Sequence, residues 1–576
     1  MGKRKIRYQP DLVVFDIETS HIERNGFDEL FTWHWSIMVN DTYYTPESWT
    51  AFYDLLLSLY DPEYDRLIVF VHNLAYETES IIRNMEDHIF SDLFASDTHR
   101  PLKFLIDEVL EFRCSYMLTG KSLKACGKDV KLEKLEMDYQ KIRYPGEKLT
   151  EEEESYCRRD VEIMAAKIRQ MEIQEKIPFT KFPLTNTGFL RNEARKVLRK
   201  NPANKKKFHE LRLDAKRFLL CRNCFSGGYV HANYIYSGKV MEDVDSYDFG
   251  SAYPFDLLVH KFPMSYFHEI SNPTWTDIQY FLQHRDNTLF ICHVVLYHCK
   301  CRYTNTFLSF NKCKTSTDVE LDNGRVYSAE YIDVCLTSLD LILVLDIYQP
   351  EKIKVEEMYW CMADYLPDEY VKLMLKYYEQ KQELKNIESE EYNYMKAKNR
   401  LNSFYGMMVT NPLHDIISLD VTDWQRDRIN YHDDSIVTEE LDKFYSNYNS
   451  FLPYQWGVFV PAYTRYHLWH DIIRHIDRYV VYSDTDSAKV INREQCIDTI
   501  ARYNAKAEQM RKSRLEKLGY TKDFPDLGLF DWETAPDKKY KGPWKGFKTL
   551  GAKKYIFPFV LKRTPITSII PYSPLL

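Results

Sequence analysis

The segment Tyr482–Ser487 places two carboxylates, Asp484 and Asp486, between two apolar stretches rich in β-favouring residues. We therefore expect two short strands joined by a tight acidic turn. Side chains two positions apart along a strand share a face, and two carboxylates on one face repel each other. A hard divalent cation is the natural partner of such a pair. The alternative is a solvated acidic hairpin turn, which is a common surface feature.

Two upstream segments have the residues that would accompany such a metal site. Asp248 follows the strand-like residues 244–247, and residues 398–406 have helical composition. Lys398, Asn402 and Tyr405 are spaced i, i+4 and i+7, which predicts one helix face, and Gly406 stands at the expected helix end. Carboxylates that face a helix bearing a cation and an aromatic ring can hold a nucleoside triphosphate while two metals promote phosphoryl transfer.

The three segments Asp248–Pro254, Lys398–Gly406 and Tyr482–Ser487 occur in the order of motifs A, B and C of family B DNA polymerases and resemble them. In detail they resemble the protein-primed branch of organellar and viral enzymes, including those of phages with small linear genomes. The resemblance implies an α/β and α+β multidomain fold: a ribonuclease H-like 3′–5′ exonuclease domain and a right-hand polymerase with palm, fingers, a reduced thumb and two insertions. The implied activity is DNA-templated DNA synthesis with 3′–5′ proofreading, for a linear viral or plasmid genome in the host cytoplasm.

The resemblance also implies roles for residues of the polymerase half. Asp248, Asp484 and Asp486 are the expected catalytic acids, and Asp248, Phe249 and Asp486 the expected metal site. The expected deoxynucleotide-binding residues are Phe249, Tyr253, Lys385, Lys398, Asn402 and Tyr405, although the spacing leaves Lys381 and Lys385 as alternatives. Tyr253 is expected beneath the sugar, where it would reject a 2′-hydroxyl, and Tyr405 near the new base pair.

A second acidic set occupies the first third of the chain. Asp16 and Glu18 end a buried strand over residues 12–20, and a second strand over 67–72 leads to Glu77. The acidic segment 151–161 is helical in composition, with Tyr156 and Asp160 on one face. Four carboxylates and a tyrosine can bind two metals and orient a water for phosphodiester hydrolysis. A run of surface acids is the alternative for residues 151–154, but it does not suit acids that follow four apolar residues.

These residues resemble the three exonuclease motifs of the same family, with Glu77 where the family pattern has aspartate. The resemblance assigns metal binding to Asp16, Glu18, Glu77 and Asp160, and catalytic roles to those acids, Tyr156 and Lys134. Lys134 has the alternative of being a surface lysine. The residues expected to hold the primer end are Thr19, Asn73, Tyr76, Ser122 and Leu123.

Two further segments are predicted to contact DNA. A basic stretch, residues 191–217, leads into Phe225, Gly227 and Gly228, which resemble a Tyr-x-Gly-Gly linker with phenylalanine in place of tyrosine. Glycines there allow the backbone to approach a phosphate strand closely. Residues 538–555 contain seven lysines and no acid, with interleaved aromatic residues, which predicts a phosphate track with stacking partners. Lys553 and Tyr555 resemble a Lys-x-Tyr motif that steadies the primer end.

The predicted domains follow the motif order. They are the exonuclease domain (1–188), the first part of the palm (189–257), a first insertion of strands and loops (258–358), the fingers (359–410), a second insertion (411–450), the second part of the palm (451–555) and a short or truncated thumb or tail (556–576). Within the first insertion, Asn323 and Gly324 predict a hairpin turn, and the apolar run 339–345 is assigned to the same strand-and-loop region. Two helices are expected over residues 365–401.

Composition limits the class of protein. The chain has 576 residues, a formal net charge of −8 and 44% hydrophobic residues, which allows a large core. No apolar run is long enough for a membrane span, and twelve cysteines suit a reducing compartment more than a disulfide scaffold. The cysteines and histidines at 221–224 and 293–313 do not complete a zinc pattern. The expected cofactor is Mg²⁺, two per active site, with Mn²⁺ as a substitute. The expected partners of a monomer are primer-template DNA, deoxynucleotides and a terminal protein primer, with no membrane.

Two other functions remain open from sequence. The first is a 3′–5′ exonuclease whose polymerase half only binds DNA. The second is a non-catalytic DNA-binding replication scaffold, which would require disrupted metal acids.

Overall fold

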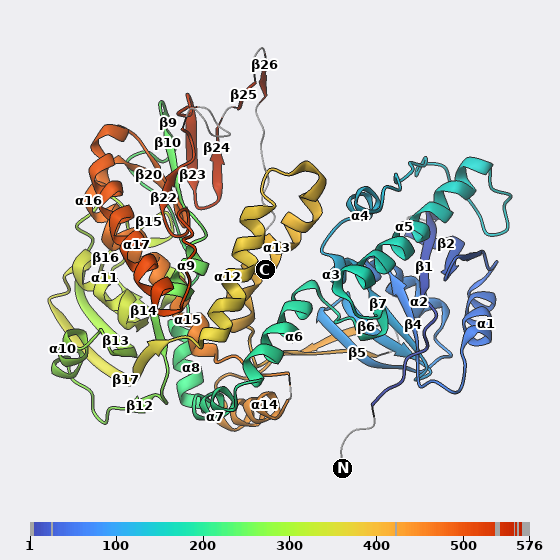
Figure 1. Cartoon of the computed structure of the whole chain (residues 1–576), viewed down its shortest axis with the longest axis horizontal. Helices are drawn as coiled ribbons and strands as arrows, with labels where there is room; N and C mark the ends of the chain where they lie inside the picture. Colours follow the sequence, from blue (N-terminus) through green and yellow to red (C-terminus); the bar gives the residue numbers. More distant parts are fainter. Residues whose placement is uncertain are drawn as a thin grey trace. The chain divides into compact units, whose positions relative to one another are not determined.

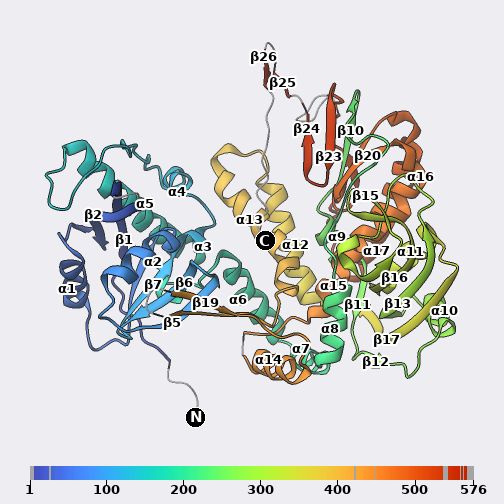
Figure 2. The ribbon, with the colours of Figure 1, turned by 180° about the vertical axis from the view of Figure 1, so that it is seen from behind.

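The structure is a computed structural model. It describes residues 5–24, 27–420, 423–447, 449–535, 542–557, 559–561 and 564–566. The chain divides into two compact units, one comprising Met1–Glu193 with His414–Ile429 and the other Ala194–Leu413 with Asn430–Leu576. Figures 1 and 2 show the helices and strands of both units from opposite sides. Among the described residues, no helix combines the length and apolar character that crossing a bilayer requires.

The first unit is built on one mixed seven-stranded sheet with the order β3-β2-β1-β4-β7-β6-β5. Its strands are β1 (Val13–Arg24), β2 (Phe27–Val39), β3 (Thr42–Tyr44), β4 (Leu67–Val71), β5 (Phe90–Asp97), β6 (Arg100–Ile106) and β7 (Leu110–Cys114). β4 lies parallel to both β1 and β7, and the other pairs are antiparallel. The β1–β2 register shifts between Glu18 and Thr19, so the predicted acidic strand contains an irregularity where its acids stand.

Helices cover both faces of this sheet. They are α1 (Trp49–Leu59), α2 (Leu74–Asn84), α3 (Ser115–Thr119), α4 (Leu123–Val130) and α5 (Glu151–Glu175), followed by a 3₁₀ turn (Phe179–Lys181). On one face the rings of Phe15 and Phe52 stack at 4.2 Å, and on the other the buried side of α5 packs against β1 and β4. α5 begins with a capping box, in which Thr150 and Glu153 satisfy each other's backbone amides. The predicted helix that contains Tyr156 and Asp160 is therefore confirmed.

A hairpin distant in sequence completes the first unit. β18 (Ile416–Asp420) and β19 (Asp423–Asp427) pair with each other, and Trp424 donates from Nε1 to Glu79 at 3.1 Å. Arg426 forms an ion pair with Asp97 of β5. The range 411–450, which the sequence suggested as one insertion, is thus divided, because α14 (Asp434–Ser446) belongs to the second unit.

The central sheet of the second unit has five antiparallel strands in the order β22-β10-β21-β20-β8. They are β8 (Tyr229–Ala232), β10 (Asp245–Phe249), β20 (Val480–Thr485), β21 (Ser487–Val490) and β22 (Phe530–Trp532). A smaller sheet joins β9 (Val240–Met241), β23 (Phe547–Gly551) and β24 (Lys554–Ile556), and β25 (Phe559–Leu561) pairs with β26 (Thr564–Ile566). The predicted strand–turn–strand over 478–491 is confirmed as β20 and β21.

Helices of the second unit pack around these sheets. They are α6 (Asn186–Arg199, which contains the boundary between the units), α7 (Pro202–Glu210), α8 (Ala215–Cys224), α9 (Ala252–Val259), α14, α15 (Tyr454–Tyr466), α16 (Arg474–Ile476) and α17 (Ile497–Lys517). A π-helical turn (His467–Ile473) links α15 to α16. Short 3₁₀ turns occur at Asp477–Tyr479 and Arg493–Gln495. α9 contacts both α15 and α17.

A second large sheet occupies the range predicted as the first insertion. It consists of β11 (Lys261–Pro263), β12 (His268–Glu269), β13 (Thr288–Lys300), β14 (Cys313–Thr317), β15 (Glu320–Asp322), β16 (Arg325–Thr337) and β17 (Lys352–Tyr365), with α10 (Trp275–Gln283), a 3₁₀ turn (Phe310–Lys312) and α11 (Ser338–Tyr348). Asn323 and Gly324 form the two-residue turn between β15 and β16 with φ of +46° and +80°, which confirms the predicted hairpin. The strand-and-loop assignment of residues 339–345 is wrong: they are helical, and an apolar run buried on most sides has no periodicity that separates helix from strand.

Two antiparallel helices occupy most of the range predicted as the fingers. They are α12 (Asp368–Glu383) and α13 (Glu391–Met408), which a 3₁₀ turn (Glu388–Glu390) precedes. The hydroxyl of Tyr370 donates to the carbonyl of Phe404 at 3.0 Å. α13 continues two residues beyond Gly406, so the predicted stop there is wrong. Gly406 is exposed and helical, and the chain leaves the helix only after Met408.

A buried ion pair joins α11 to α15. Arg465 of α15 donates to both carboxylate oxygens of Asp340 in α11, at 2.9 and 2.7 Å, and both side chains are almost fully buried. Arg465 also donates to the carbonyl of Gly227 at 2.6 Å and to that of Ser226. One guanidinium therefore fixes the linker before β8, because its fork satisfies a carboxylate and two carbonyls at once.

We expect Asp340→Ala to lower the free energy of unfolding of the second unit by about 3 to 5 kcal/mol, because it leaves the Arg465 charge buried and uncompensated. Denaturant unfolding measured by tryptophan fluorescence would show the loss. The matched control is Asp340→Ala combined with Arg465→Met, which removes the stranded charge and should regain part of the stability. An Asp340→Ala protein as stable as the parent would show that the pair is not the constraint described.

Two candidate metal-dependent active sites

The palm acids meet through the register of two neighbouring strands. Asp248 at the end of β10 pairs with Ser487, the first residue of β21, and Asp486 immediately precedes it. The amide of Phe249 donates to the carbonyl of Asp486 at 2.9 Å. Thr485, with φ of +58°, makes the turn that returns the chain from β20 to β21. Acids more than two hundred positions apart in sequence are therefore neighbours in the sheet.

These carboxyl groups are electrostatically unfavourable neighbours. Burial, and then the charge of Asp486, raise the pKa of Asp248 to about 8. Burial, and then the charge of Asp484, raise the pKa of Asp486 to about 6 against the opposing effect of a backbone hydrogen bond. Buried carboxylates with raised pKa values are stabilised in their charged form by a bound cation, so this set is chemically suited to a divalent metal.

The sequence did not single out Lys489 and Glu533, which also belong to this site. The ammonium of Lys489 donates to Ser246 at 2.7 Å and lies 3.8 Å from the carboxylate of Glu533. Burial lowers the pKa of Lys489, while Glu533 and Asp248 oppose that change. A lysine inside a buried four-residue strand is unusual enough to have indicated a role. Glu533 had no comparable signal.

The predicted Lys-x-Tyr segment lies against the acidic turn. Lys553 forms an ion pair with Asp484, its amide donates to the hydroxyl of Tyr482 at 3.0 Å, and the Tyr555 ring lies 5.1 Å from that of Tyr482. The predicted stacking role of the neighbouring aromatics is wrong for Trp544 and Phe547. Both are buried in the core with Tyr482, which leaves their faces unavailable to bases. Lys538 to Lys541 lie outside the described residues.

The glycine linker approaches the same turn. A Cβ atom on Gly228 would lie 2.8 Å from the Cα of Thr485, so only glycine fits there without moving the turn. Gly227 has open space, and Phe225 follows the last residue of α8, where its carbonyl accepts from Lys312 at 2.7 Å. Close packing against Thr485 therefore explains why residue 228 is glycine, without any contact to DNA.

Lys381 of α12 lies near Asp248, and the charges of Lys385 and Lys398 lie near Lys381. Lys381 of α12 donates to the hydroxyl of Ser251 at 3.0 Å, and Ser251 has φ of +57° at the start of α9. Burial, and then the charges of Lys398 and Lys385, lower the pKa of Lys381, while Asp248 opposes them. Lys385 stands beyond the end of α12. A concentration of positive charge beside acids is what a metal-bound triphosphate requires.

Two tyrosines from the predicted motifs A and B pack together. The ring centroids of Tyr253 in α9 and Tyr405 in α13 are 4.5 Å apart. Asn402, one helical turn before Tyr405, is exposed. The structure thus brings Tyr253 and Tyr405 together, and their predicted role in nucleotide binding stays a prediction.

The second acidic site lies in the first unit. Carboxylate oxygens of Asp16, Glu18 and Asp160 lie within 4.8 Å of one another. The side chain of Glu77 also interacts with that of Asp16. Within the described part of the chain, Glu77 Oε2 and Asp160 Oδ1 are buried without a hydrogen-bond partner. Orphaned buried oxygens among clustered acids are the condition that metal binding would relieve, so these residues fit a divalent cation.

The pKa shifts at this site have the same origin. Burial, and then the charge of Asp160, raise the pKa of Asp16 to about 7. Burial and the charge of Asp16 also raise the pKa values of Glu18 and Glu77. The longer side chain of Glu77 therefore still reaches the cluster that the family pattern builds with aspartate.

A tyrosine and a lysine complete the exonuclease-like cluster. Lys134 forms an ion pair with Asp160, and its ammonium lies 3.5 Å from the hydroxyl of Tyr156. Tyr139, which the sequence did not single out, shares a 2.8 Å hydrogen bond with that hydroxyl. Lys134 is therefore not a free surface lysine.

The residues predicted to hold the primer end belong to three elements of the same unit. Thr19 and Tyr76 share a hydrogen bond between their hydroxyls. Asn73 precedes α2 with φ of +64°, and Ser122 accepts the amide of Ala125 as the N-cap of α4, which Leu123 begins. Ser122 thus has a structural role in addition to the predicted one.

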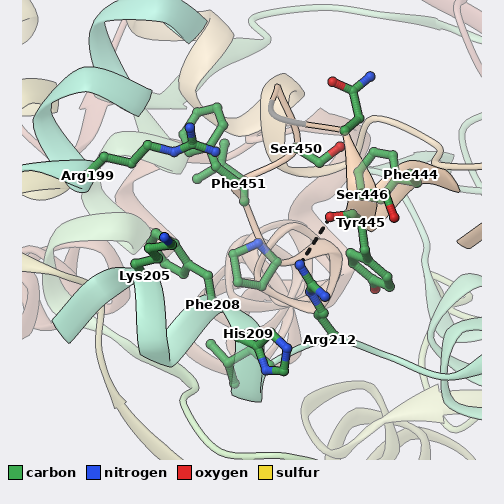
Figure 3. Close-up of a pocket in the computed structure, with 14 residues that line it drawn as sticks. Arg199, Lys205, Phe208, His209, Arg212, Phe444, Tyr445, Ser446, Ser450 and Phe451 are labelled. Carbon is green, nitrogen blue, oxygen red and sulfur yellow. Dashed lines mark hydrogen bonds between the residues drawn. The ribbon is translucent and has the colours of Figure 1, made fainter. Parts of the chain in front are cut away.

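A further concave surface lies in the basic segment of the second unit. Arg199, Lys205, His209 and Arg212 surround its opening, and Leu211 and residues 451–453 are its buried floor. Figure 3 shows Arg212 turned toward Tyr445, whose carbonyl it contacts at 3.1 Å. The described residues that line this pocket of about 260 Å³ include no acid. It is suited to an anionic group, but its lining holds no carboxylate for a metal-dependent reaction.

Comparison with solved structures identifies the class of fold. The chain is similar to Phi29 DNA polymerase complexed with primer-template DNA and incoming nucleotides, with a TM-score of 0.68, 18% identity, and coverage of 97% of this chain and 89% of the other. A binary complex of Phi29 DNA polymerase with primer-template DNA gives the same score and identity, with 90% of that chain covered. The predicted α/β and α+β multidomain fold is confirmed as a fold similar to that of Phi29 DNA polymerase.

The family follows from a sequence-model comparison. Residues 124–453, more than half of the chain, match the model for DNA polymerase type B, organellar and viral. The chain belongs to this family. No curated protein sequence matched it.

We expect Mg²⁺ to stabilise the first unit more at pH 8 than at pH 6. The folded pKa of Asp16 is about 7, above its ordinary value near 3.8, so in the metal-free protein its contribution to stability falls as the pH rises between these values. Mg²⁺ binds the ionised form, and its stabilising effect therefore grows over the same range. Thermal unfolding with and without Mg²⁺ at both pH values measures the difference.

The control for this prediction is Asp16→Asn with Glu18→Gln, which keeps the side-chain shapes and removes two charges. The pH dependence of the Mg²⁺ effect should shrink in this variant, and the part that remains reports the palm acids. An equal Mg²⁺ shift at both pH values in the parent would contradict the assignment of metal binding to these carboxyl groups.

Proposed function

We propose that the protein is a DNA-templated DNA polymerase with 3′–5′ proofreading exonuclease activity. The observation that carries the proposal is the adjacency of Asp248 and Asp486 across β10 and β21, with Lys381 of α12 near Asp248. A separate acidic cluster in the first unit supports the second activity. Membership of the organellar and viral type B polymerase family supports the reaction class.

In the polymerase site, Asp248, Asp486 and the backbone at Phe249 would hold Mg²⁺, or Mn²⁺ in its place. Bound there, the metals would activate the primer hydroxyl and neutralise charge on the leaving pyrophosphate. Lys381 and Lys398 bind the triphosphate by charge-assisted hydrogen bonds. Asp484, which pairs with Lys553, supports the acidic turn and places that lysine beside the primer end.

We assign discrimination between deoxyribose and ribose to Tyr253 and Tyr405. Tyr253 packs against Tyr405 at 4.5 Å between centroids, so neither ring moves without the other. A rigid ring beneath the sugar would exclude a 2′-hydroxyl by contact, and Tyr405 would lie against the nascent base pair. Asn402 presents its exposed amide on the same helix for the substrate.

In the exonuclease site, Asp16, Glu18, Glu77 and Asp160 would hold Mg²⁺, which supplies the charge that activates a water for phosphodiester hydrolysis. Tyr156 is held by Tyr139 and by Lys134, so its hydroxyl is oriented toward the reacting phosphate. Thr19, Tyr76 and Asn73 bind the frayed primer end beside it, together with Ser122 and Leu123 at the start of α4.

From these roles we infer that the substrates are primer-template DNA and deoxynucleotides. The enzyme would act as a monomer and replicate a linear viral or plasmid genome in the host cytoplasm. The branch that the motifs resemble uses a hydroxyl of a separate terminal protein as its first primer. We extend this to the present chain, with the sheet of residues 258–358 as the segment that would grip that partner.

Two variants should separate the activities. Asp248→Asn removes a palm charge and should lower primer extension by about a hundredfold or more while 3′ trimming persists, the scale expected when one electrostatic group of a catalytic site is lost. Asp16→Asn with Glu18→Gln should lower 3′ trimming while primer extension persists. A labelled primer-template incubated in Mg²⁺ with and without deoxynucleotides reports both reactions.

Each variant is the control for the other. Extension by the Asp248→Asn protein at the rate of the parent would exclude the proposed palm site. Loss of both activities in either variant would indicate a folding defect, which circular dichroism detects. Trimming without any extension by the parent would support the alternative of an exonuclease whose polymerase half only binds DNA.

Substitution of Lys381 and of Lys385 should change the KM for deoxynucleotides to different extents. Lys381 contacts Ser251 beside Asp248, whereas Lys385 lies beyond the helix end, so Lys381→Ala should raise the KM for deoxynucleotides by about 10-fold to 100-fold through loss of a charge-assisted hydrogen bond. Lys385→Ala is the matched control, with a smaller change. Steady-state extension kinetics measure both, and a larger effect at Lys385 would restore the assignment favoured from the sequence.

A further inference from the structure

A buried group of side chains beneath α9 has no role in either site described above. Asp256 and His260 lie on or just after α9, and His467 begins the π-helical turn that follows α15. Their ligand atoms converge within 4.8 Å, and Asp256 and His467 are almost completely buried. Within the part of the chain that the structure describes, this and the exonuclease cluster are the groups with a metal-ligand arrangement.

The three ligand atoms form a triangle of suitable size. His260 Nε2 and His467 Nε2 are 2.7 Å apart, and Asp256 Oδ1 lies 3.6 Å from the first and 3.8 Å from the second. A triangle with these sides has its equidistant point about 2.0 Å from each corner, which is the length of a bond from Zn²⁺ to imidazole nitrogen or carboxylate oxygen. A metal could therefore occupy the centre with small side-chain movements.

Hydrogen bonds to His467 Nδ1 and to the second carboxylate oxygen of Asp256 orient the remaining lone pairs of both side chains toward the centre of the triangle. His467 Nδ1 contacts Asp471 Oδ2 at 2.7 Å, and Lys506 holds Asp471 at 2.8 Å. This carboxylate keeps the proton on Nδ1, so the lone pair on Nε2 faces the triangle, as in metal sites where a second carboxylate orients the ligand histidine. Thr464 donates to the other oxygen of Asp256, which leaves Oδ1 directed at the two imidazoles beyond hydrogen-bond distance.

Aromatic rings surround much of this group. The Tyr463 ring stacks on His260 with centroids 3.9 Å apart and planes parallel within 1°. Phe255 and Tyr503 lie against His467. The π-helical turn that presents His467 is a rare geometry, and such turns are frequent at functional sites. A carboxylate buried here beside two imidazoles is electrostatically favourable when a cation lies among them.

We propose that Asp256, His260 and His467 bind one transition-metal ion of the Zn²⁺ type, with Asp471 as the outer carboxylate. Two imidazoles and one carboxylate select such an ion over Mg²⁺, which prefers an all-oxygen shell. The metal would join α9, which carries Tyr253, to the helix that follows α15, and so has a structural role distinct from the metals of catalysis. The proposal stands whether or not the chain polymerises DNA.

The test uses the full chain without a histidine tag, stripped by a chelator and returned to buffer that contains millimolar Mg²⁺. Titration with Co²⁺, a spectroscopic substitute for Zn²⁺, should develop visible ligand-field absorption that saturates at one ion per chain, and Zn²⁺ should abolish it. Elemental analysis gives the stoichiometry, and thermal unfolding should shift upward on Zn²⁺ addition.

Variants assign the signal to these residues. His260→Gln and His467→Gln should lose it, and Asp471→Asn should weaken Co²⁺ binding by about 10-fold to 100-fold while all three ligands remain. Asp16→Asn with Glu18→Gln is the matched control, which removes the other acidic cluster and should bind as the parent does. Far-UV circular dichroism in the presence of a chelator shows whether each variant is folded.

Three outcomes would overturn the proposal. They are a folded parent that gives no ligand-field absorption, absorption that persists in both histidine variants, and near-ultraviolet thiolate-to-metal bands that assign the bound ion to cysteines. In any of them, the 2.7 Å contact is a neutral hydrogen bond between two histidines.

Discussion

The arrangement of the palm depends on repulsion between carboxylates that the sheet register forces together. Antiparallel pairing of β10 with β21 fixes Asp248 beside Asp486, and burial makes their charges more costly than in water. The surrounding structure is a response to that cost: Lys489 from within the sheet, Lys553 from the following hairpin and Lys381 from the fingers all bring positive charge to the acids. Burial of the acids without these cations would destabilise the fold.

In the first unit, the charges of the buried acids are compensated in a different way. There the acids come from a strand and two helices, and Lys134 is the cation in contact with Asp160. Two carboxylate oxygens stay buried without partners, whereas in the palm the strand backbone and several lysines share the compensation. This difference indicates that the acids of the first unit depend more strongly on a bound cation for their stability.

Several local features of the fold and of both sites could be predicted from the sequence, because they depend on the spacing of neighbouring residues. The acidic turn at 484–486, the hairpin at Asn323 and Gly324, and the helix face shared by Tyr156 and Asp160 follow from spacing alone. The failures share a cause, which is tertiary context. Residues 339–345 are an apolar run buried on most sides, which has no periodicity that separates a helix from a strand. Trp544 and Phe547 are core residues because they pack with Val244 and Tyr482. The sequence left Lys381 and Lys385 as alternatives, because only the fold shows that Lys381 contacts Ser251 and that α12 ends before Lys385. Glu533 stands in a segment without any pattern.

The hairpin of β18 and β19 makes the first unit discontinuous in the chain. Its sheet and helices are complete by residue 193, yet Trp424 and Arg426, which contact Glu79 and Asp97, are synthesised more than two hundred residues later. During synthesis on the ribosome, the surface around β5 must therefore stay uncovered while the palm and fingers emerge. The first unit therefore gains the contacts of Trp424 and Arg426 only after the intervening residues have been synthesised.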